Sequence, residues 1–341
     1  MEPAVRRTRS RALVTTLAAT ALVLSACGGG GGSEEEGGTD PQETSAGSTL
    51  ASTWPLTGLP VKGDDSATQD HPVLVLKMDN TSSSAPQVGL GSADLVVEEL
   101  VEGGMTRLAA FYYSEIPDDA GPVRSMRASD IGIVSPADAA MVTSGAAPIT
   151  IKRIKGAGIE FFGEGAKGFY RASGRSAPYN LFTDMTETAT LTEGGDRPAD
   201  YLSWGAPEDL PKGKPASSLA ASFGGAHTTS WVYRDGGYVN EGSYAADGDE
   251  FPADSVLVLR VEVGDAGYTD PAGNPVPETK LEGKGEAMLF HGGRMVRGTW
   301  SKKALDAPIE LSTKQGELTV PAGRTWIELV PRETGNVTFS R

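Results

Sequence analysis

Short apolar runs separated by turn residues dominate the chain from residue 72 onward, and the first of these runs predicts a buried strand. Residues 72–78 are rich in β-branched and apolar side chains and are followed by the polar pair Asp79-Asn80. Residues 81–86 then supply Thr, Ser and Pro, which are typical of a turn. The pattern therefore places two polar side chains where a buried strand ends.

Residues 96–113 are compatible with two local structures, a β-hairpin or a helix that ends before Gly103. Gly103-Gly104 is a common type of two-residue hairpin loop, and the apolar and aromatic run at 108–113 favours a strand after it. We therefore favour the hairpin. The helix remains the alternative.

Both structures predict that Glu98 and Glu102 are neighbours. In the hairpin, alternation puts Glu98, Leu100 and Glu102 on one face, with Arg107 across from Leu100. In the helix, the two glutamates are four residues apart and again share a face.

The remaining patterns predict an α+β protein with two domains. A Gly-Pro turn at 121–122 precedes a short helix expected at 124–134, and segments 137–142 and 150–159 are expected to be helical or connecting. From about residue 223, short strands alternate with Gly-rich reversals, which favours a β-rich domain. We expect strands at 228–234, 256–263, 287–290, 295–300, 317–320 and 325–330.

About 290 residues are long for one core, so we predict domains at 54–190 and 223–335, joined by a connection at 191–222.

The first 53 residues predict export and a lipid anchor. Four arginines precede an apolar run at 12–24, which is too short to span about 30 Å of hydrocarbon comfortably and is typical of a signal peptide at 1–26. Leu24-Ser25-Ala26-Cys27 matches a bacterial lipobox, in which the cysteine is diacylated; the alternative is an ordinary cleaved signal that contains a cysteine. Residues 27–53 have almost no apolar side chains and predict a disordered tether. The sequence leaves the general and twin-arginine export routes open.

Charge and residue counts exclude several classes of function. Residues 1–26 carry +3 of a total charge of −15, so residues 27–341 carry −18, which disfavours nucleic-acid binding. The three histidines have no metal-ligand spacing, so neither a metal nor another cofactor is expected. Cys27 is the only cysteine, so no intrachain disulfide is possible. No nucleophile-elbow motif or phosphate-binding loop is present.

Five arginines in this acidic chain are the strongest candidates for binding: Arg107, Arg124, Arg127, Arg171 and Arg175. Guanidinium groups bind phosphate or carboxylate bidentately, and Arg124 near a helix start would add backbone N–H donors. The alternative is internal pairing of the same arginines with Asp79, Glu98, Glu102 and Asp130. Glu98 and Glu102 are also compatible with a glycosidase-like acid/base pair.

Several islands resemble the YerB-like family of bacterial lipoproteins. The resemblance to its N-terminal domain lies in residues 71–80, 93–107 and 121–127, with the cores Val-Glu-Gly-Gly-Met-Thr-Arg and Gly-Pro-Val-Arg-Ser-Met-Arg. The resemblance to its C-terminal domain lies in residues 283–287, 298–302 and 321–327. The resemblance covers residues 55–335. It implies a lipid-anchored envelope protein of uncharacterised activity, with a layered α/β N-terminal domain and a β-rich C-terminal one. Where the family pattern has Ala-Pro-His-Asn, this chain has Ala177-Pro178-Tyr179-Asn180, so a mechanism that relied on that histidine would not operate here.

We therefore expect a binding or scaffold lipoprotein on the extracytoplasmic face of the cell membrane, anchored through Cys27. Its partner would be an anionic envelope ligand or an envelope protein. The alternative is an enzyme that acts on a cell-wall glycan or phosphodiester polymer, with Arg124 and Arg127 stabilising negative charge and Glu98, Glu102 or Asp79 as the base. The expected ligand-binding residues are Asp79, Asn80, Glu98, Glu102, Arg107, Arg124, Arg127, Arg171, Arg175, Tyr179 and Asn180.

Overall fold

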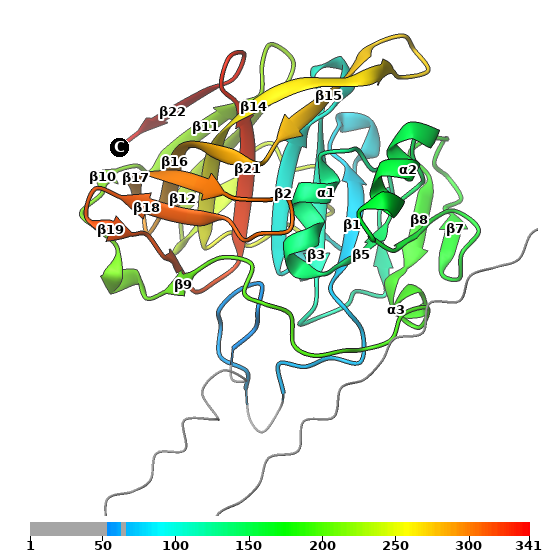
Figure 1. Cartoon of the computed structure of the whole chain (residues 1–341), viewed down its shortest axis with the longest axis horizontal. Coiled ribbons are helices and arrows are strands. Elements are labelled where there is room, and N and C mark those ends of the chain that lie inside the picture. Colours follow the sequence, from blue (N-terminus) through cyan, green and yellow to red (C-terminus); the bar gives the residue numbers. More distant parts are fainter. Residues whose placement is uncertain (1–52, 63–65) are drawn as a thin grey trace, which may run out of the picture. The chain divides into compact units, whose positions relative to one another are not determined.

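A computed structural model describes residues 53–62 and 66–341 of the chain (Figure 1). Their main feature is a 13-stranded sheet with the order β19-β18-β17-β16-β14-β21-β2-β3-β1-β5-β6, to which β10 and β15 add at β17 and β14. The strands from the first half of the chain are β1 (Leu74–Asp79), β2 (Leu95–Leu100), β3 (Thr106–Tyr112), β5 (Ala140–Val142) and β6 (Phe161–Phe162). Those from the second half are β10 (Lys214–Pro215), β14 (Ser255–Thr269), β15 (Pro275–Lys280), β16 (Gly283–His291), β17 (Arg294–Lys302), β18 (Glu310–Thr313), β19 (Gly316–Glu317) and β21 (Thr325–Pro331).

The two halves of the chain meet in this sheet through a parallel pair of strands. β2 pairs with β21 from Leu95↔Thr325 to Glu99↔Leu329, and β21 pairs in parallel with β14 on its other edge. The sheet therefore runs across the connection at 191–222, and all described residues fall within one compact unit.

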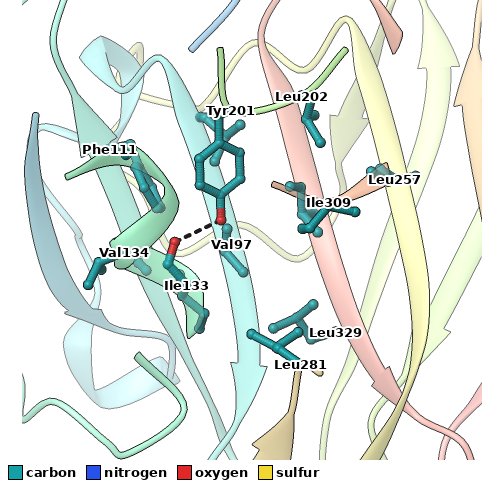
Figure 2. Packing of buried hydrophobic residues seen from close by; sticks show 14 of the residues in the cluster. Val97, Phe111, Ile133, Val134, Tyr201, Leu202, Leu257, Leu281, Ile309 and Leu329 are labelled. Atoms are coloured by element: carbon teal, nitrogen blue, oxygen red, sulfur yellow. Dashed lines mark hydrogen bonds between the residues drawn. The ribbon is translucent and has the colours of Figure 1, made fainter. Parts of the chain in front are cut away.

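One face of the sheet is covered by two short helices, α1 (Asp130–Val134) and α2 (Pro148–Gly156). Figure 2 shows how this core continues across the β2–β21 seam, since Val97 and Phe111 belong to the same apolar cluster as Leu257 and Leu329. Tyr201 packs edge-on against Phe111, with 5.2 Å between ring centroids, and its hydroxyl donates to the Ile133 carbonyl at 2.8 Å. Each such large apolar side chain contributes about 1.5–3 kcal/mol by burial.

The other face is covered by a second, four-stranded sheet. It has the order β13-β12-β11-β22, and its side chains Leu219 and Trp231 join the same apolar cluster as Val96 and Trp326 of the main sheet. These strands are β11 (Ser218–Ser222), β12 (Thr228–Arg234), β13 (Gly237–Asn240) and β22 (Asn336–Ser340). The remaining elements are β4 (Asp119–Ala120), β7 (Phe169–Arg171), β8 (Leu181–Asp184), α3 (Met185–Ala189), β9 (Trp204–Gly205) and β20 (Val320–Pro321).

The hairpin at 95–112 is confirmed, but its predicted register was wrong by one residue. Val101 N–H donates to the Met105 carbonyl, so the connection has five residues rather than two, and Arg107 lies opposite Glu99 instead of Leu100. A slip of one residue exchanges the two faces of a strand. Arg107 consequently shares a face of the sheet with Glu99 rather than with Glu98, and the site is built differently from the prediction.

Three further local predictions are corrected. The helix begins at Asp130 rather than at Arg124, because residues 124–127 are extended and follow β1 through the Arg124 N–H donated to the Lys77 carbonyl. Segment 137–142 contains strand β5. The strand expected at 317–320 is two short strands, β19 and β20. The strand-rich character of the second half is confirmed, and the described chain as a whole is strand-rich with short helices.

Candidate functional site

Polar side chains gather on both faces of the main sheet where β1 and β2 end and β3 begins. On the helix-covered face, Lys77 Nζ lies 2.7 Å from Glu99 Oε1 and 2.8 Å from Asp130 Oδ1, and all three side chains are fully buried. Burial opposes the charge on Lys77, but the charges of Asp130 and Glu99 outweigh it and raise the lysine pKa. Burial raises the pKa of Glu99. The trio is a charged centre of the core that the sequence analysis did not identify.

Arg107 and Arg127 share one carboxylate on this same face. Arg127 Nε donates to Glu102 Oε2 at 2.9 Å, its Nη2 donates to Oε1, and Arg107 Nη2 donates to Oε1 at 3.2 Å. Burial raises the pKa of Glu102, but the hydrogen bond from Arg127 and the two guanidinium charges outweigh it, so the pKa is lowered. Burial, followed by the charge of Arg127, lowers the pKa of Arg107 to about 10. Arg107 also donates to the Ser125 carbonyl at 2.8 Å, so the group joins β3, the β2–β3 connection and the segment 124–127.

Arg124 connects this buried group to the surface. Its Nε lies 2.8 Å from Asp79 Oδ2, and the side chain keeps 18% of its area exposed while Asp79 keeps 4%. The guanidinium carbon stands 5.3 Å from the centroid of the Tyr179 ring, a cation–π arrangement. Arg124 is therefore held between a buried acid and an exposed loop.

That loop, residues 170–180, which we call the arginine–tyrosine loop, holds the accessible part of the predicted site. Arg171 donates to both oxygens of Glu164 at 2.6 and 2.7 Å and to Asn180 Oδ1 at 2.7 Å. Arg175 differs, because it donates to the backbone carbonyls of Ser84 and Pro86 and stacks 4.8 Å from the Phe182 ring. Among the described residues, no carboxylate forms an ion pair with Arg175.

The opposite face of β2 holds a second polar group, centred on Glu98 and Glu328, which we call the carboxylate pair. The two residues are register partners on β2 and β21, both side chains are fully buried, and the carboxyl groups hydrogen-bond to each other. Trp231 Nε1 donates to Glu328 at 2.8 Å. Glu98 accepts hydrogen bonds from Asn80 and from Thr229, each at 2.9 Å.

The surroundings of the carboxylate pair favour the protonated form of Glu328 and the ionised form of Glu98. Burial, followed by the Glu98 charge, raises the pKa of Glu328 well above its ordinary value. Burial also opposes ionisation of Glu98, but hydrogen bonds from His227 and Glu328 outweigh it and lower its pKa. His227 Nε2 lies 2.9 Å from Glu98 Oε1, and this contact raises the histidine pKa despite partial burial.

His227 connects the carboxylate pair to solvent. Its side chain keeps 15% of its area exposed and lines a cavity of about 180 Å³ with Asn80, Thr229 and Tyr244. The arrangement can exchange protons between water and a buried pair of acids. The sequence analysis missed His227 and Glu328, since they follow Glu98 by more than a hundred residues and no local pattern connects them.

The structure separates the predicted site residues into two groups. Asp79, Asn80, Glu98, Glu102, Arg107 and Arg127 are buried, whereas Arg171 is exposed and Arg124, Arg175, Tyr179 and Asn180 are partly exposed. Glu98 and Glu102 are not neighbours: Glu98 binds His227, Asn80 and Thr229, and Glu102 binds Arg107 and Arg127. Of the residues named in the catalytic alternative, Arg124 pairs with Asp79 and Arg127 pairs with Glu102, so these residues do not form the unpaired arrangement that the alternative needs.

Two further observations concern the described ranges. They contain no cluster of three or more His, Cys, Asp or Glu side chains placed to hold a metal ion. None of their helices combines the length and the hydropathy that a membrane span needs. The predicted lipidation site Cys27 lies outside the described residues.

Comparison with known proteins identifies relatives along most of the chain. The chain is 27% identical over 295 residues to "Putative lipoprotein YerB" of Bacillus subtilis (strain 168), which covers 81% of this chain and 86% of that protein. The crystal structure of YerB from Bacillus subtilis superposes with a TM-score of 0.69 at 20% identity, over 84% of this chain and 99% of that one. This structural likeness concerns the fold.

Family profiles match both halves of the sequence. Residues 56–197 match the N-terminal domain of the protein family of unknown function DUF3048, and residues 219–327 match its C-terminal domain. The two matched segments are the ones that the β2–β21 pairing joins in one sheet. The chain therefore belongs to the DUF3048 family, the family of YerB.

Proposed function

We propose that the protein is a lipid-anchored binding protein on the extracytoplasmic face of the cell membrane, and that it binds an anionic group of an envelope component without catalysis. The anchor rests on the lipobox at Cys27 and on the name of the YerB relative, a lipoprotein. The proposal includes the layered α/β interpretation of residues 54–190, with α1 and α2 on one face of the sheet.

The observation that carries the binding proposal is the position of Arg175. Its guanidinium contacts neutral carbonyls and an aromatic face at the molecular surface, so its charge is not compensated by an adjacent acid among the described residues. Tyr170, with 40% of its area exposed, and Tyr179 lie in the same loop. Arginine and tyrosine are the residues most enriched at binding hot spots. Guanidinium groups also prefer carboxylate and phosphate ligands.

The buried part of the site supports this loop. Arg107, Arg127 and Glu102 fix the segment that carries Arg124, and Arg124 stacks on Tyr179. Because these groups neutralise one another, we assign them a positioning role. Preorganisation of this kind lowers the entropy lost when a ligand binds.

Arg175→Gln tests the proposal, with Arg332→Gln as the matched control at an exposed arginine of the second half. The probes are fluorescent oligomers of glycerol phosphate and of galacturonate, which separate phosphate from carboxylate recognition. A charge-assisted hydrogen bond contributes about 1.5–3 kcal/mol, so Arg175→Gln should weaken binding of the recognised probe about tenfold or more, while Arg332→Gln leaves it unchanged. Equal affinity of the two variants for both probes, with circular dichroism unchanged, would refute the assignment.

A further inference from the structure

One cavity lies at the end of the main sheet away from the arginine–tyrosine loop. It is a groove of about 630 Å³ between β10, β17 and the β18–β19 turn, and we call it the basic groove. In Figure 1 these strands lie at one end of the sheet, and α2, β7 and β8 lie at the other. The lining residues are Pro211, Lys212, Lys214, Met295, Val296, Arg297, Gly298, Thr299, Ser312, Thr313, Lys314 and Gln315.

The charge of the basic groove is opposite to that of the protein. Four cationic side chains line it, Lys212, Lys214, Arg297 and Lys314, and no Asp or Glu does. Arg297 pairs with Glu286, but within the described ranges the three lysines form no ion pair, and all three are exposed. In a chain with a net charge of −15, this is a local positive site. It favours an anionic ligand through electrostatic attraction.

The backbone of β17 is open in this groove. On one edge, β17 pairs with β16 along its whole length. On the other edge, β10 covers Arg294 and Met295 and β18 covers residues 299–301, so no described strand pairs there with residues 296–298. Three strand residues span about 10 Å. An open stretch of strand edge binds an extended peptide by adding a strand.

We infer that the basic groove binds an extended acidic peptide segment of a partner protein by strand addition to β17. The peptide would lie antiparallel to β17, in line with β10 and β18, which both pair antiparallel with it. Side chains of an extended peptide alternate between two sides, so carboxylates two residues apart would reach the lysines together. We choose a peptide rather than another polyanion because only a peptide would use the open strand edge. Another polyanion would bind through the lysine charges alone.

The test uses the purified full-length protein and the fluorescent peptide Glu-Val-Glu, whose length matches residues 296–298 of β17, in an anisotropy titration. Lys212→Glu with Lys314→Glu should raise the Kd at least tenfold. The matched control is Lys152→Glu with Lys167→Glu, which makes the same change in net charge at two exposed lysines outside the groove and should leave the Kd within twofold. Equal losses in the two double variants would overturn the proposal, because they would show an effect of net charge alone.

A peptide with the same sequence and N-methylated backbone amides distinguishes strand addition from simple charge attraction. We expect it to bind at least tenfold more weakly than the parent peptide. If it binds as well, or if inorganic polyphosphate at equal charge concentration displaces the parent peptide as effectively as unlabelled peptide does, the groove is a polyanion site and the proposal fails. The assay is independent of Arg175, so this outcome leaves the test of the proposed function unaffected.

Discussion

Replacing Glu328 by glutamine removes the titratable proton of the carboxylate pair. The effect of this substitution on the free energy of unfolding depends on pH in a defined direction. The folded-state pKa of Glu328 is raised well above its ordinary value of 4.5, so between these two pKa values the folded protein binds a proton that the unfolded chain has released. Stability contributed by this group is fully present below pH 4.5 and is lost as pH rises toward the folded-state pKa. In this window the loss is about 1.4 kcal/mol per pH unit.

The range from pH 5 to 6 isolates this proton from its neighbours. The pKa of His227 is raised above 6.5 in the folded protein, so the histidine is mostly protonated in both states in this range and adds little to the slope. The pKa of Glu98 is lowered, so Glu98 adds little to the slope above pH 5. Glutamine can still donate to Glu98 and accept from Trp231, so its packing is close to that of the protonated acid.

We therefore expect the free energy of unfolding of Glu328→Gln minus that of the unmodified protein to increase by about 1.4 kcal/mol from pH 5 to pH 6. Urea denaturation followed by tryptophan fluorescence at pH 5.0, 5.5 and 6.0 measures it. Glu262→Gln, at an exposed glutamate of the nearby strand β14, shows how the same comparison responds to neutralising a surface carboxylate. A difference between Glu328→Gln and the unmodified protein that stays constant with pH would refute the placement of the proton on Glu328.

Two further predictions concern the core and the anchor. Lys77→Met leaves Glu99 and Asp130 buried without their cation, which should reduce the free energy of unfolding by about 3–5 kcal/mol. Urea denaturation at pH 7 measures this loss. A loss below about 1 kcal/mol would contradict the interpretation that Lys77, Glu99 and Asp130 form a charged centre of the core. Cys27→Ser should move the protein from the detergent phase to the aqueous phase in Triton X-114 partitioning, because in the proposed lipoprotein the acyl chains on Cys27 hold the protein at the bilayer. An unchanged distribution would argue against lipidation.

The sequence indicated the strands of this fold better than it indicated their pairing. Gly103-Gly104 and the following apolar run were sufficient to predict a hairpin, since both signals are local. The register depended on whether the loop has two residues or five, and alternation in the strands is compatible with both. In the observed register, the buried side chains on one face include Lys77, Glu99 and Asp130. These three residues come from three different elements, so no local pattern predicts their contact.

The same limit applies to the candidate site. The alternative of internal pairing anticipated Asp79 and Glu102 as partners of arginines, because they lie in the same short islands. It did not anticipate that Asp130 pairs with Lys77 or that Glu98 pairs with His227. Nothing local relates Glu98 to Glu328, which meet only because β2 and β21 lie side by side. The roles of the eleven predicted residues in ligand binding stay predictions.

The parallel pairing of β2 with β21 also constrains when the protein can reach its native state. The contact between Trp326 and Glu98 spans 228 residues, so the strand that completes the centre of the sheet is synthesised long after β2. Until β21 pairs with it, one edge of β2 is unpaired and Glu98 lacks its contact with Trp326. Contacts so distant along the chain slow folding, so β2 can complete its pairing only after β21 has been made. Premature termination upstream of residue 325 would yield a fragment prone to association through the unpaired edge of β2.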